Sequence, residues 1–191
     1  MTTITIFGSG NMGQAIAGVF ARGGADIQHV GSSDTAAEIA GDIVVLAVPY
    51  PALAVIADTY GDKLAGKTVV DITNPLDFST FDSLVVPVGS SAAAQLQQLL
   101  PAAKVVKAFN TNFAASLASG TVGGAPTTVL AAGDDVDAKA SLIAAVQAGG
   151  LAAIDAGSLA RAHELEALGF LQLTLAVGEK IGWTGGFAVV K

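Results

Sequence analysis

The segment that most restricts the fold of this chain lies among its first residues. A short apolar run, Ile4–Phe7, leads directly into Gly-Ser-Gly-Asn-Met-Gly at residues 8–13, and a helical pattern follows. A strand, a G-x-G-x-x-G turn and a helix in this order form a dinucleotide-binding fingerprint. In that fingerprint, Gly8 allows the tight turn, Gly10 lets the backbone approach a pyrophosphate, and Gly13 lets the helix lie close to the strand. Free N–H groups at the start of the helix can then bind phosphate oxygens.

Composition limits the classes of protein that fit. With 52% hydrophobic and 13% charged residues, the chain is not disordered and suits a fold whose strands are covered on both faces. The net charge is −7 and the 9 Lys and Arg residues are spread along the chain, so we expect no nucleic-acid partner. With no cysteine and 2 histidines, we expect no metal site. We also expect a cytoplasmic protein without a membrane partner, because no signal-peptide pattern and no apolar span of ~18 residues occurs.

Short segments rich in valine, isoleucine and alanine are predicted strands, and helical patterns separate most of them. Several, such as Ile43–Val48, are nearly continuous apolar runs, which is typical of parallel strands buried on both faces. The predicted class is therefore α/β, a doubly wound and mostly parallel Rossmann sheet with right-handed crossovers. The predicted strands are Thr3–Phe7, Asp26–Val30, Ile43–Val48, Thr68–Ile72, Lys104–Phe109, Thr127–Ala132 and Leu151–Asp155.

The connection after the second strand is unusually short. Only about a dozen residues separate Val30 from Ile43, whereas a complete Rossmann half needs a further strand there, and one crossover alone takes at least about 10–12 residues. Only a short helix, about Thr35–Ala40, fits. We predict a trimmed sheet with strand order 2-1-3-4-5 and onward, whose ligand crevice lies at the strands' carboxyl ends, between the first and third strands.

The chain divides near Gly157 in this reading. Residues 1–157 form the dinucleotide-binding Rossmann domain, and residues 158–191 form a C-terminal helix and tail that complete the pocket or a dimer interface. Ser158 would cap the long helix, which runs from Leu159 to about Ile181.

Polar residues and prolines follow the central strands where their carboxyl ends meet. Tyr50, the pair Asn74-Pro75 and residues 110–112 would border a nicotinamide. An Asn there could bind a carboxamide or the second substrate. Asn74 could equally satisfy its own backbone in a turn, and for Asn112 the turn is the favoured interpretation. Lys107 and Tyr50 are the only side chains near the crevice with proton-transfer potential. We predict no catalytic side chain, because hydride transfer between two aromatic cofactors needs no protein acid or base.

The end of the second strand bears on the choice between NAD and NADP. An NAD enzyme usually has Asp or Glu about 20 residues past the glycines, and here that place holds Ser32 and Ser33. We expect NADP, with these hydroxyls near its 2′-phosphate, although no Lys or Arg occurs between Arg22 and Lys63. NAD stays possible, since Asp34 lies just beyond and could bind a ribose or cap a helix.

These motifs resemble those of the NADP-dependent oxidoreductases of the deazaflavin (coenzyme F-420) type, whose Rossmann unit also occurs in the cytoplasmic domain of eukaryotic metalloreductases. The resemblance lies in the glycine motif, in Ala-Val-Pro at 47–49, in Asp-Ile-Thr-Asn-Pro at 71–75 and in Val106–Thr111, and it continues to Glu166. It implies that NADP binds to the glycine loop, to a Ser-Arg pair after the second strand and to the Val-Pro loop. Ser33 stands where the family usually has Arg.

The resemblance also implies a small-molecule electron acceptor, with a flavin or deazaflavin as co-substrate near Lys107–Thr111. It further implies a homodimer through the C-terminal helix, whose apolar face would be Leu165, Leu168, Leu171 and Leu175. Together, the fingerprint, the crevice and the resemblance give the expected cofactor-binding residues: Gly8, Ser9, Gly10, Asn11, Met12, Gly13, Ser32, Ser33, Ala47, Val48, Pro49, Tyr50, Asn74, Pro75 and Ala108.

The function expected from this reading is NADPH-dependent hydride transfer to a deazaflavin, flavin or quinone-like acceptor. Two alternatives stay open. An imine or 2-hydroxyacid reductase of the pyrroline-5-carboxylate or 6-phosphogluconate type has a similar glycine motif, but such enzymes append a large helical domain. A dinucleotide sensor without catalysis would also fit a crevice that has no defined acid, base or nucleophile.

Overall fold

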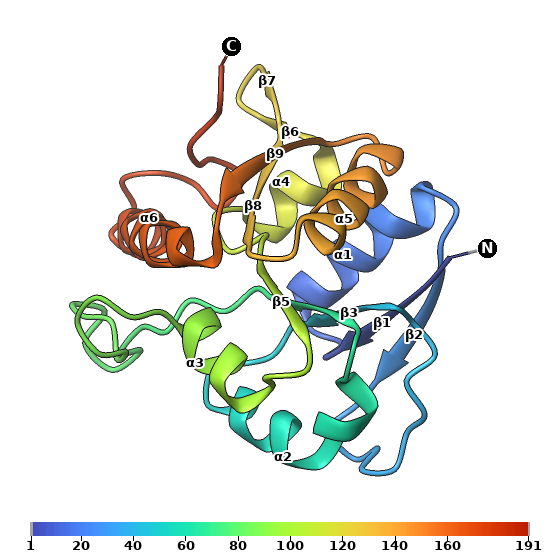
Figure 1. Cartoon of the computed structure of the whole chain (residues 1–191). Coiled ribbons are helices and arrows are strands. Elements are labelled where there is room, and N and C mark those ends of the chain that lie inside the picture. The colour runs from blue at the N-terminus through green and yellow to red at the C-terminus, as the bar shows by residue number, and fades with distance from the viewer. Residues whose placement is uncertain (1, 191) are drawn as a thin grey trace.

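The computed structural model describes residues 2–190, so the outermost residues of the two expected domains, 1 and 191, lie outside it. A seven-stranded sheet runs through the molecule in the order β2-β1-β3-β4-β5-β8-β9 (Figure 1). All seven expected strands form, and the predicted order 2-1-3-4-5 is confirmed. Neighbours are parallel except β5 and β8, which are antiparallel. The strands are β1 (Thr3–Phe7), β2 (Asp26–Val30), β3 (Ile43–Leu46), β4 (Thr68–Asp71), β5 (Lys104–Lys107), β8 (Thr128–Gly133) and β9 (Ala152–Gly157), with a separate hairpin of β6 (Thr121–Val122) and β7 (Ala125–Pro126).

Helices cover both faces of the sheet. α1, α4 and α5 lie on one face and α2 and α3 on the other (Figure 1). Because the central strands are buried on both faces, their alternate side chains pack into two separate apolar clusters. One cluster contains Ile6 and Phe20, and the other contains Leu46 and Leu96. The helices are α1 (Asn11–Arg22), α2 (Ala52–Leu64), α3 (Ala92–Leu99), α4 (Ala114–Ser119), α5 (Val136–Ala148), the 3-10 turn η1 (Leu159–Arg161) and α6 (Ala162–Val177).

Four central strands end at the same level. Phe7, Leu46, Asp71 and Lys107 are consecutive partners in the register of β1, β3, β4 and β5. The third, fourth and fifth strands therefore stop one or two residues earlier than the sequence predicted. The loops that follow all start from one edge of the sheet, which is where ligands bind in open α/β folds.

The connection between β2 and β3 does not contain the expected helix at 35–40. Side chains from outside the segment form hydrogen bonds with its backbone groups instead. Gln28 Nε2 donates to Glu38 O at 2.7 Å, and Ala40 N donates to Gln28 Oε1 at 3.0 Å. Lys63 Nζ donates to Ala37 O at 2.9 Å. With these partners in place, the segment crosses to β3 without forming helical hydrogen bonds.

The expected long helix over 159–181 is shorter and starts differently. It begins as η1, continues as α6 and ends at Val177. Ser158 makes no side-chain cap, and Leu159 N donates instead to Asp134 Oδ1 at 2.9 Å. No helix within residues 2–190 is both long enough and apolar enough to cross a membrane.

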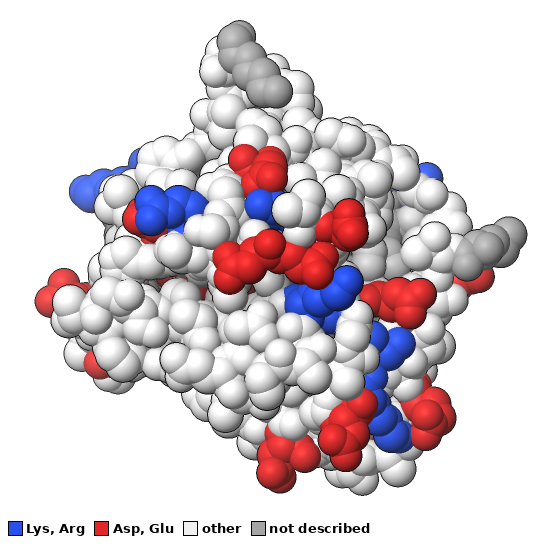
Figure 2. Space-filling view, viewed as in Figure 1, with Lys and Arg blue, Asp and Glu red and all other residues white. Residues whose placement is uncertain are grey.

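Surface charges are mixed rather than gathered. Figure 2 shows Lys and Arg side chains beside Asp and Glu side chains on this face of the molecule. Ion pairs at the surface include Lys63–Glu38 at 2.8 Å and Lys104–Asp135 at 3.2 Å.

Candidate functional site

The glycine loop between β1 and α1 has three glycines with different surroundings. Gly8 has φ +97°, and a Cβ there would lie 2.2 Å from Ala47 O. A Cβ at Gly13 would lie 2.5 Å from Gly8 O. A Cβ at Gly10 would meet nothing within 4 Å, although Gly10 lines a cavity. The chain thus packs against Gly8 and Gly13 and leaves space at Gly10, as the fingerprint requires for a pyrophosphate.

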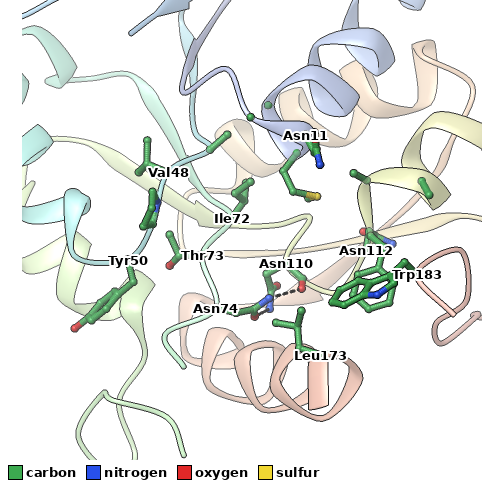
Figure 3. Close-up of a pocket in the computed structure, with 18 of the residues that line it drawn as sticks. Asn11, Val48, Tyr50, Ile72, Thr73, Asn74, Asn110, Asn112, Leu173 and Trp183 are labelled. Carbon is green, nitrogen blue, oxygen red and sulfur yellow. Dashed lines mark hydrogen bonds between the residues drawn. The ribbon is translucent and has the colours of Figure 1, made fainter. Parts of the chain in front are cut away.

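A cavity of about 830 Å³ opens at the carboxyl edge of the sheet, between the glycine loop and α6 (Figure 3). It unites loops that follow β1, β3, β4 and β5 with residues from α6 and the C-terminal tail, residues 178–190. Its lining carries no charged side chain among the described residues. It consists of Gly10, Asn11, Met12, Gly13, Ala47, Val48, Pro49, Tyr50, Ile72, Thr73, Asn74, Phe78, Asn110, Asn112, Phe113, Ala114, Ala115, Leu173 and Trp183.

Most of the expected cofactor-binding residues lie at this cavity, but some do not. Gly8 and Ser9 form the turn that precedes its lining, and Ser32 and Ser33 lie exposed at the end of β2. Pro75 and Ala108 are buried and are not part of the lining. Ala108 is 0% exposed because it continues the β4–β5 ladder, where its N–H donates to Asp71 O at 3.1 Å, and packs in the core. The structure therefore does not bring these two residues to the cavity.

An amide pair, Asn74 and Asn110, forms one wall of the cavity (Figure 3). Asn74 Nδ2 donates to Asn110 O at 2.8 Å, and Asn110 Nδ2 donates to Asn74 Oδ1 at 2.9 Å and to Leu165 O at 2.7 Å. Gly169 of α6 lies against this pair, since a Cβ there would be 2.3 Å from Asn74 Oδ1. The preceding residue, Phe109, has a left-handed φ of +62°, which is rare for a bulky residue and turns the chain toward Asn74.

Within the described residues 2–190, three buried polar atoms of the lining have no hydrogen-bond partner. They are Thr73 Oγ1, Asn110 Oδ1 and Asn112 Oδ1. A buried acceptor without a donor costs about 1–3 kcal/mol, so such atoms call for a ligand. A carboxamide, as in nicotinamide, offers the N–H donors that these oxygens lack. Together with the open space at Gly10, this donor deficit fits a dinucleotide that runs from the glycine loop to the amide pair.

Beneath the cavity lies a buried ionic cluster of Asp71, Lys107 and Glu166. Lys107 Nζ lies 2.9 Å from Asp71 Oδ2 and 2.8 Å from Glu166 Oε1, and it also donates to Thr73 O. Glu166 Oε2 accepts from Ala92 N at 2.9 Å, at the start of α3. Burial raises the pKa of the Glu166 carboxyl, while Lys107 and the Ala92 N–H act in the opposite direction. All three side chains are at most 1% exposed, so Lys107 is not open to the cavity for proton transfer.

The other expected proton-transfer group, Tyr50, is also engaged. Its hydroxyl donates to Gln95 Oε1 in α3, and the ring reaches the cavity only with its other atoms (Figure 3). Of the two histidines, His29 is exposed on β2, and His163 Nδ1 lies 3.1 Å from Ser90 O. No group of three or more possible metal-binding side chains occurs within residues 2–190.

Among the residues that the structure describes, the end of the second strand carries hydroxyls but no cation. Arg22 donates to Gly149 O and Leu117 O at 3.3 Å, and Lys63 binds the β2–β3 connection. Asp34 does not cap a helix. Its Oδ2 accepts from Gly31 N at 2.9 Å instead.

Several site residues were missed by the sequence analysis. Asp71 and Glu166 belong to the motifs that carry the resemblance, but no role was predicted for their side chains. Leu173, Phe113 and Trp183 were not named as site residues, although the C-terminal helix and tail were expected to complete the pocket or a dimer interface. The only available signal for Trp183 was that it is the single tryptophan of the chain.

Comparison with known proteins gives consistent relatives, although no family model matches the chain. The chain is 33% identical over 165 residues to an F420-dependent NADP reductase of Methanocaldococcus jannaschii, a match that covers 84% of this chain and 73% of that protein. It is 39% identical over 107 residues to the metalloreductase STEAP3 of Rattus norvegicus, but the match covers 56% of this chain and only 21% of that protein.

Among solved structures, a candidate F420-dependent NADP-reductase from Arthrobacter sp. FB24 has a TM-score of 0.85 at 25% identity. The superposition covers 98% of this chain and 99% of that chain. More distant solved reductases, under 25% identical, share the fold alone.

Proposed function

This chain belongs to the F420-dependent NADP reductase family, and from that premise we propose that it transfers a hydride between NADP(H) and a flavin-like acceptor. The observation that carries the proposal is the cavity itself. One uncharged chamber connects the open space at Gly10 with an amide wall and with an aromatic end at Trp183. Such a chamber can hold two aromatic groups in contact and keep water away, and hydride transfer needs little else from the protein.

Different residues of the chain would bind different parts of the NADP(H) molecule. The N–H groups at the start of α1 would bind the pyrophosphate, and Ser32 and Ser33 would face the adenosine 2′-phosphate. Asn74 and Asn110 would orient the carboxamide of the nicotinamide ring. When bound, NADPH would supply a hydride, that is two electrons and one proton, from its nicotinamide ring to the ring of the acceptor, and would leave as NADP+; the second proton of the reduced acceptor would come from solvent. Val48 and Pro49 would cover the ring on the β3 side.

A panel assay tests this proposal. The purified protein is mixed with NADPH and, separately, with a deazaflavin, FMN, FAD, a quinone, a ferric chelate, cyclic imines and keto acids. We expect NADPH oxidation with the flavin-like acceptors. Turnover only with imines or keto acids would favour the imine or hydroxyacid reductase, and tight NADPH binding without any turnover would favour a dinucleotide sensor.

We further propose that the protein is a homodimer, in which an apolar face of α6 is the contact. Leu171 is 49% exposed, and Leu168 and Leu175 on the same face are half-buried. Leu165, expected on this face, is instead buried within its own chain at 6% exposure. The candidate interface is therefore the face formed by Leu168, Leu171 and Leu175, one and two helical turns apart.

A further inference from the structure

The cavity continues beyond the amide pair to an end that a dinucleotide would leave free. Asn112 and Phe113 follow β5, whereas Ser32 follows β2, and β1, β3 and β4 lie between these two strands. We propose that Asn112, Phe113 and Trp183 at this end determine which acceptor binds. The two aromatic side chains pack against the ring of the acceptor, and Asn112 Oδ1 accepts a hydrogen bond from a ring N–H. This inference rests on the proposed function and names the residues that select its second substrate.

Phe113 and Trp183 form an aromatic wall. Their ring centroids are 5.1 Å apart and their planes are inclined by 54°. Phe113 is 8% exposed, but Trp183 is 54% exposed although it lines the cavity. An uncovered indole beside a cavity is a surface on which a flat aromatic ring can pack. Such an aromatic contact contributes binding free energy beyond that of the apolar area it buries.

The tail holds Trp183 in place. Lys180 N donates to Leu175 O at 2.8 Å at the end of α6, and Gly185 N donates to Gly182 O at 2.8 Å just after Trp183. Farther on, Phe187 N donates at 3.2 Å to the Oε1 of Gln172, a side chain only 1% exposed. The indole is thus fixed on both sides, so the wall exists before any ligand arrives and costs little ordering entropy on binding.

Asn112 supplies the polar part of this end (Figure 3). Its Nδ2 donates to Thr128 O at 3.1 Å, which fixes the amide, and Oδ1 has no partner among residues 2–190. The residue is 6% exposed and lines the cavity, and a donor on a ligand in the cavity would remove the cost of leaving this acceptor unpaired. The imide edge of a flavin or deazaflavin carries an N–H, whereas a quinone ring or a ferric chelate has no such donor. Asn112 therefore favours an imide-bearing tricyclic acceptor over the other acceptors in the panel.

The single tryptophan makes this end directly observable. The full chain, saturated with NADP+, is titrated with lumiflavin and with N3-methyllumiflavin, which lacks the imide N–H. We expect saturable quenching of the Trp183 fluorescence by lumiflavin and weaker binding of the methylated ring. In steady state, Trp183→Ala should raise the KM for lumiflavin about tenfold. Trp183→Phe should bring the KM most of the way back to the wild-type value. Asn112→Ala should bind both flavins equally. The KM for NADPH should stay within about twofold throughout.

Phe187→Ala is the matched control, because it removes an exposed aromatic residue of the same tail that does not line the cavity. Its KM for lumiflavin should equal that of the wild type. An unchanged KM in Trp183→Ala, or an unchanged preference in Asn112→Ala, would overturn this inference while leaving the proposed function intact. If no flavin-like acceptor turns over, the proposed function fails. The fluorescence titration then tests the acceptor site separately, and an absence of quenching by lumiflavin would overturn this inference as well.

Discussion

Gly10 differs from Gly8 and Gly13 in what surrounds its missing side chain. At Gly8 and Gly13 the nearest atoms are backbone oxygens of the protein itself, so these two residues serve the fold. At Gly10 the surroundings are open and φ is −71°, a value that any residue adopts. A side chain at Gly10 would therefore be tolerated by the fold and excluded only by a ligand.

This difference gives a paired prediction. Gly10→Val should fold, with a stability loss of at most about 1 kcal/mol at this N-cap position, and should weaken NADP+ binding by at least about tenfold. Gly13→Val should instead lower the free energy of unfolding by several times that amount, because its side chain meets Gly8 O. Calorimetric titration and urea unfolding measure the two effects. Unchanged NADP+ affinity in Gly10→Val would show that the pyrophosphate binds elsewhere.

The choice of dinucleotide also rests on single residues. Ser33 is exposed at the end of β2, and neighbouring cations are engaged elsewhere. Ser33→Arg should lower the Kd for NADP+ about tenfold, because a charged hydrogen bond to the 2′-phosphate contributes about 1.5–3 kcal/mol, and it should leave the Kd for NAD+ nearly unchanged. Asp34→Ala is the companion measurement. If the wild type binds NAD+ more tightly than NADP+, and Asp34→Ala weakens the binding of NAD+, the prediction of NADP is wrong.

Among the secondary-structure elements, the sheet was predictable and the buried ionic cluster was not. Apolar runs such as Ile43–Leu46 are short and continuous, so their type and order followed from composition and spacing. The pairing of Asp71 with Lys107 depends on the register of β4 against β5. The approach of Glu166 depends on how α6 packs across the edge of the sheet. Both contacts join residues that are far apart in the sequence, so local patterns do not predict them. The position of Trp183 at the far end of the cavity depends in the same way on packing between distant segments.

The buried ionic cluster joins four elements by their ends. It connects β4 and β5 to the start of α3 and, through Glu166, to α6. Asp71 Oδ1 also accepts from Thr73 N at 2.8 Å, so the cluster fixes the backbone that leads to the amide pair. Removing one partner of a buried ion pair leaves an uncompensated charge, which costs about 3–5 kcal/mol.

Lys107→Met should therefore lower the free energy of unfolding at neutral pH by about 3–5 kcal/mol, because the acidic side chains of Asp71 and Glu166 stay buried without their cation. Glu166→Gln should cost less, since Lys107 keeps Asp71 and the amide oxygen can still accept from α3. Adding Glu166→Gln to Lys107→Met should restore part of the loss. Urea unfolding of the three variants measures the coupling, and strictly additive losses would contradict it.

The cluster also predicts a pH dependence. The pKa of Glu166 is raised in the folded protein above its ordinary value of 4.5, so the folded state binds the proton more tightly than the unfolded state. The stabilisation from this group is complete below that ordinary value and is lost as the pH rises through the raised pKa. As the pH rises above about 4.5, the free energy of unfolding of the wild type should fall relative to that of Glu166→Gln. Parallel curves for the two proteins would contradict the assignment.

At the scale of the whole molecule, the two ends of the sequence meet at the cavity. Asn11 of the first loop and Trp183 of the tail line the same chamber, and α6 approaches the amide pair closely only because residue 169 is glycine. The C-terminal segment therefore completes the site that the N-terminal fingerprint begins. Any contact that holds α6 in place also supports the cavity wall that Leu173 provides.

A second copy of the chain is the proposed source of such a contact. Leu171→Glu places a charge at the centre of the face formed by Leu168, Leu171 and Leu175, so it should convert a dimer to a monomer. The free energy of unfolding of the isolated subunit should change by no more than about 0.5 kcal/mol, because Leu171 is 49% exposed within the chain. Val55→Glu, at a 65% exposed position on α2, is the matched control and should leave the dimer intact. Sedimentation velocity over a concentration series distinguishes these states. A wild type that sediments as a monomer at all concentrations would show that this apolar face has no partner in a second copy.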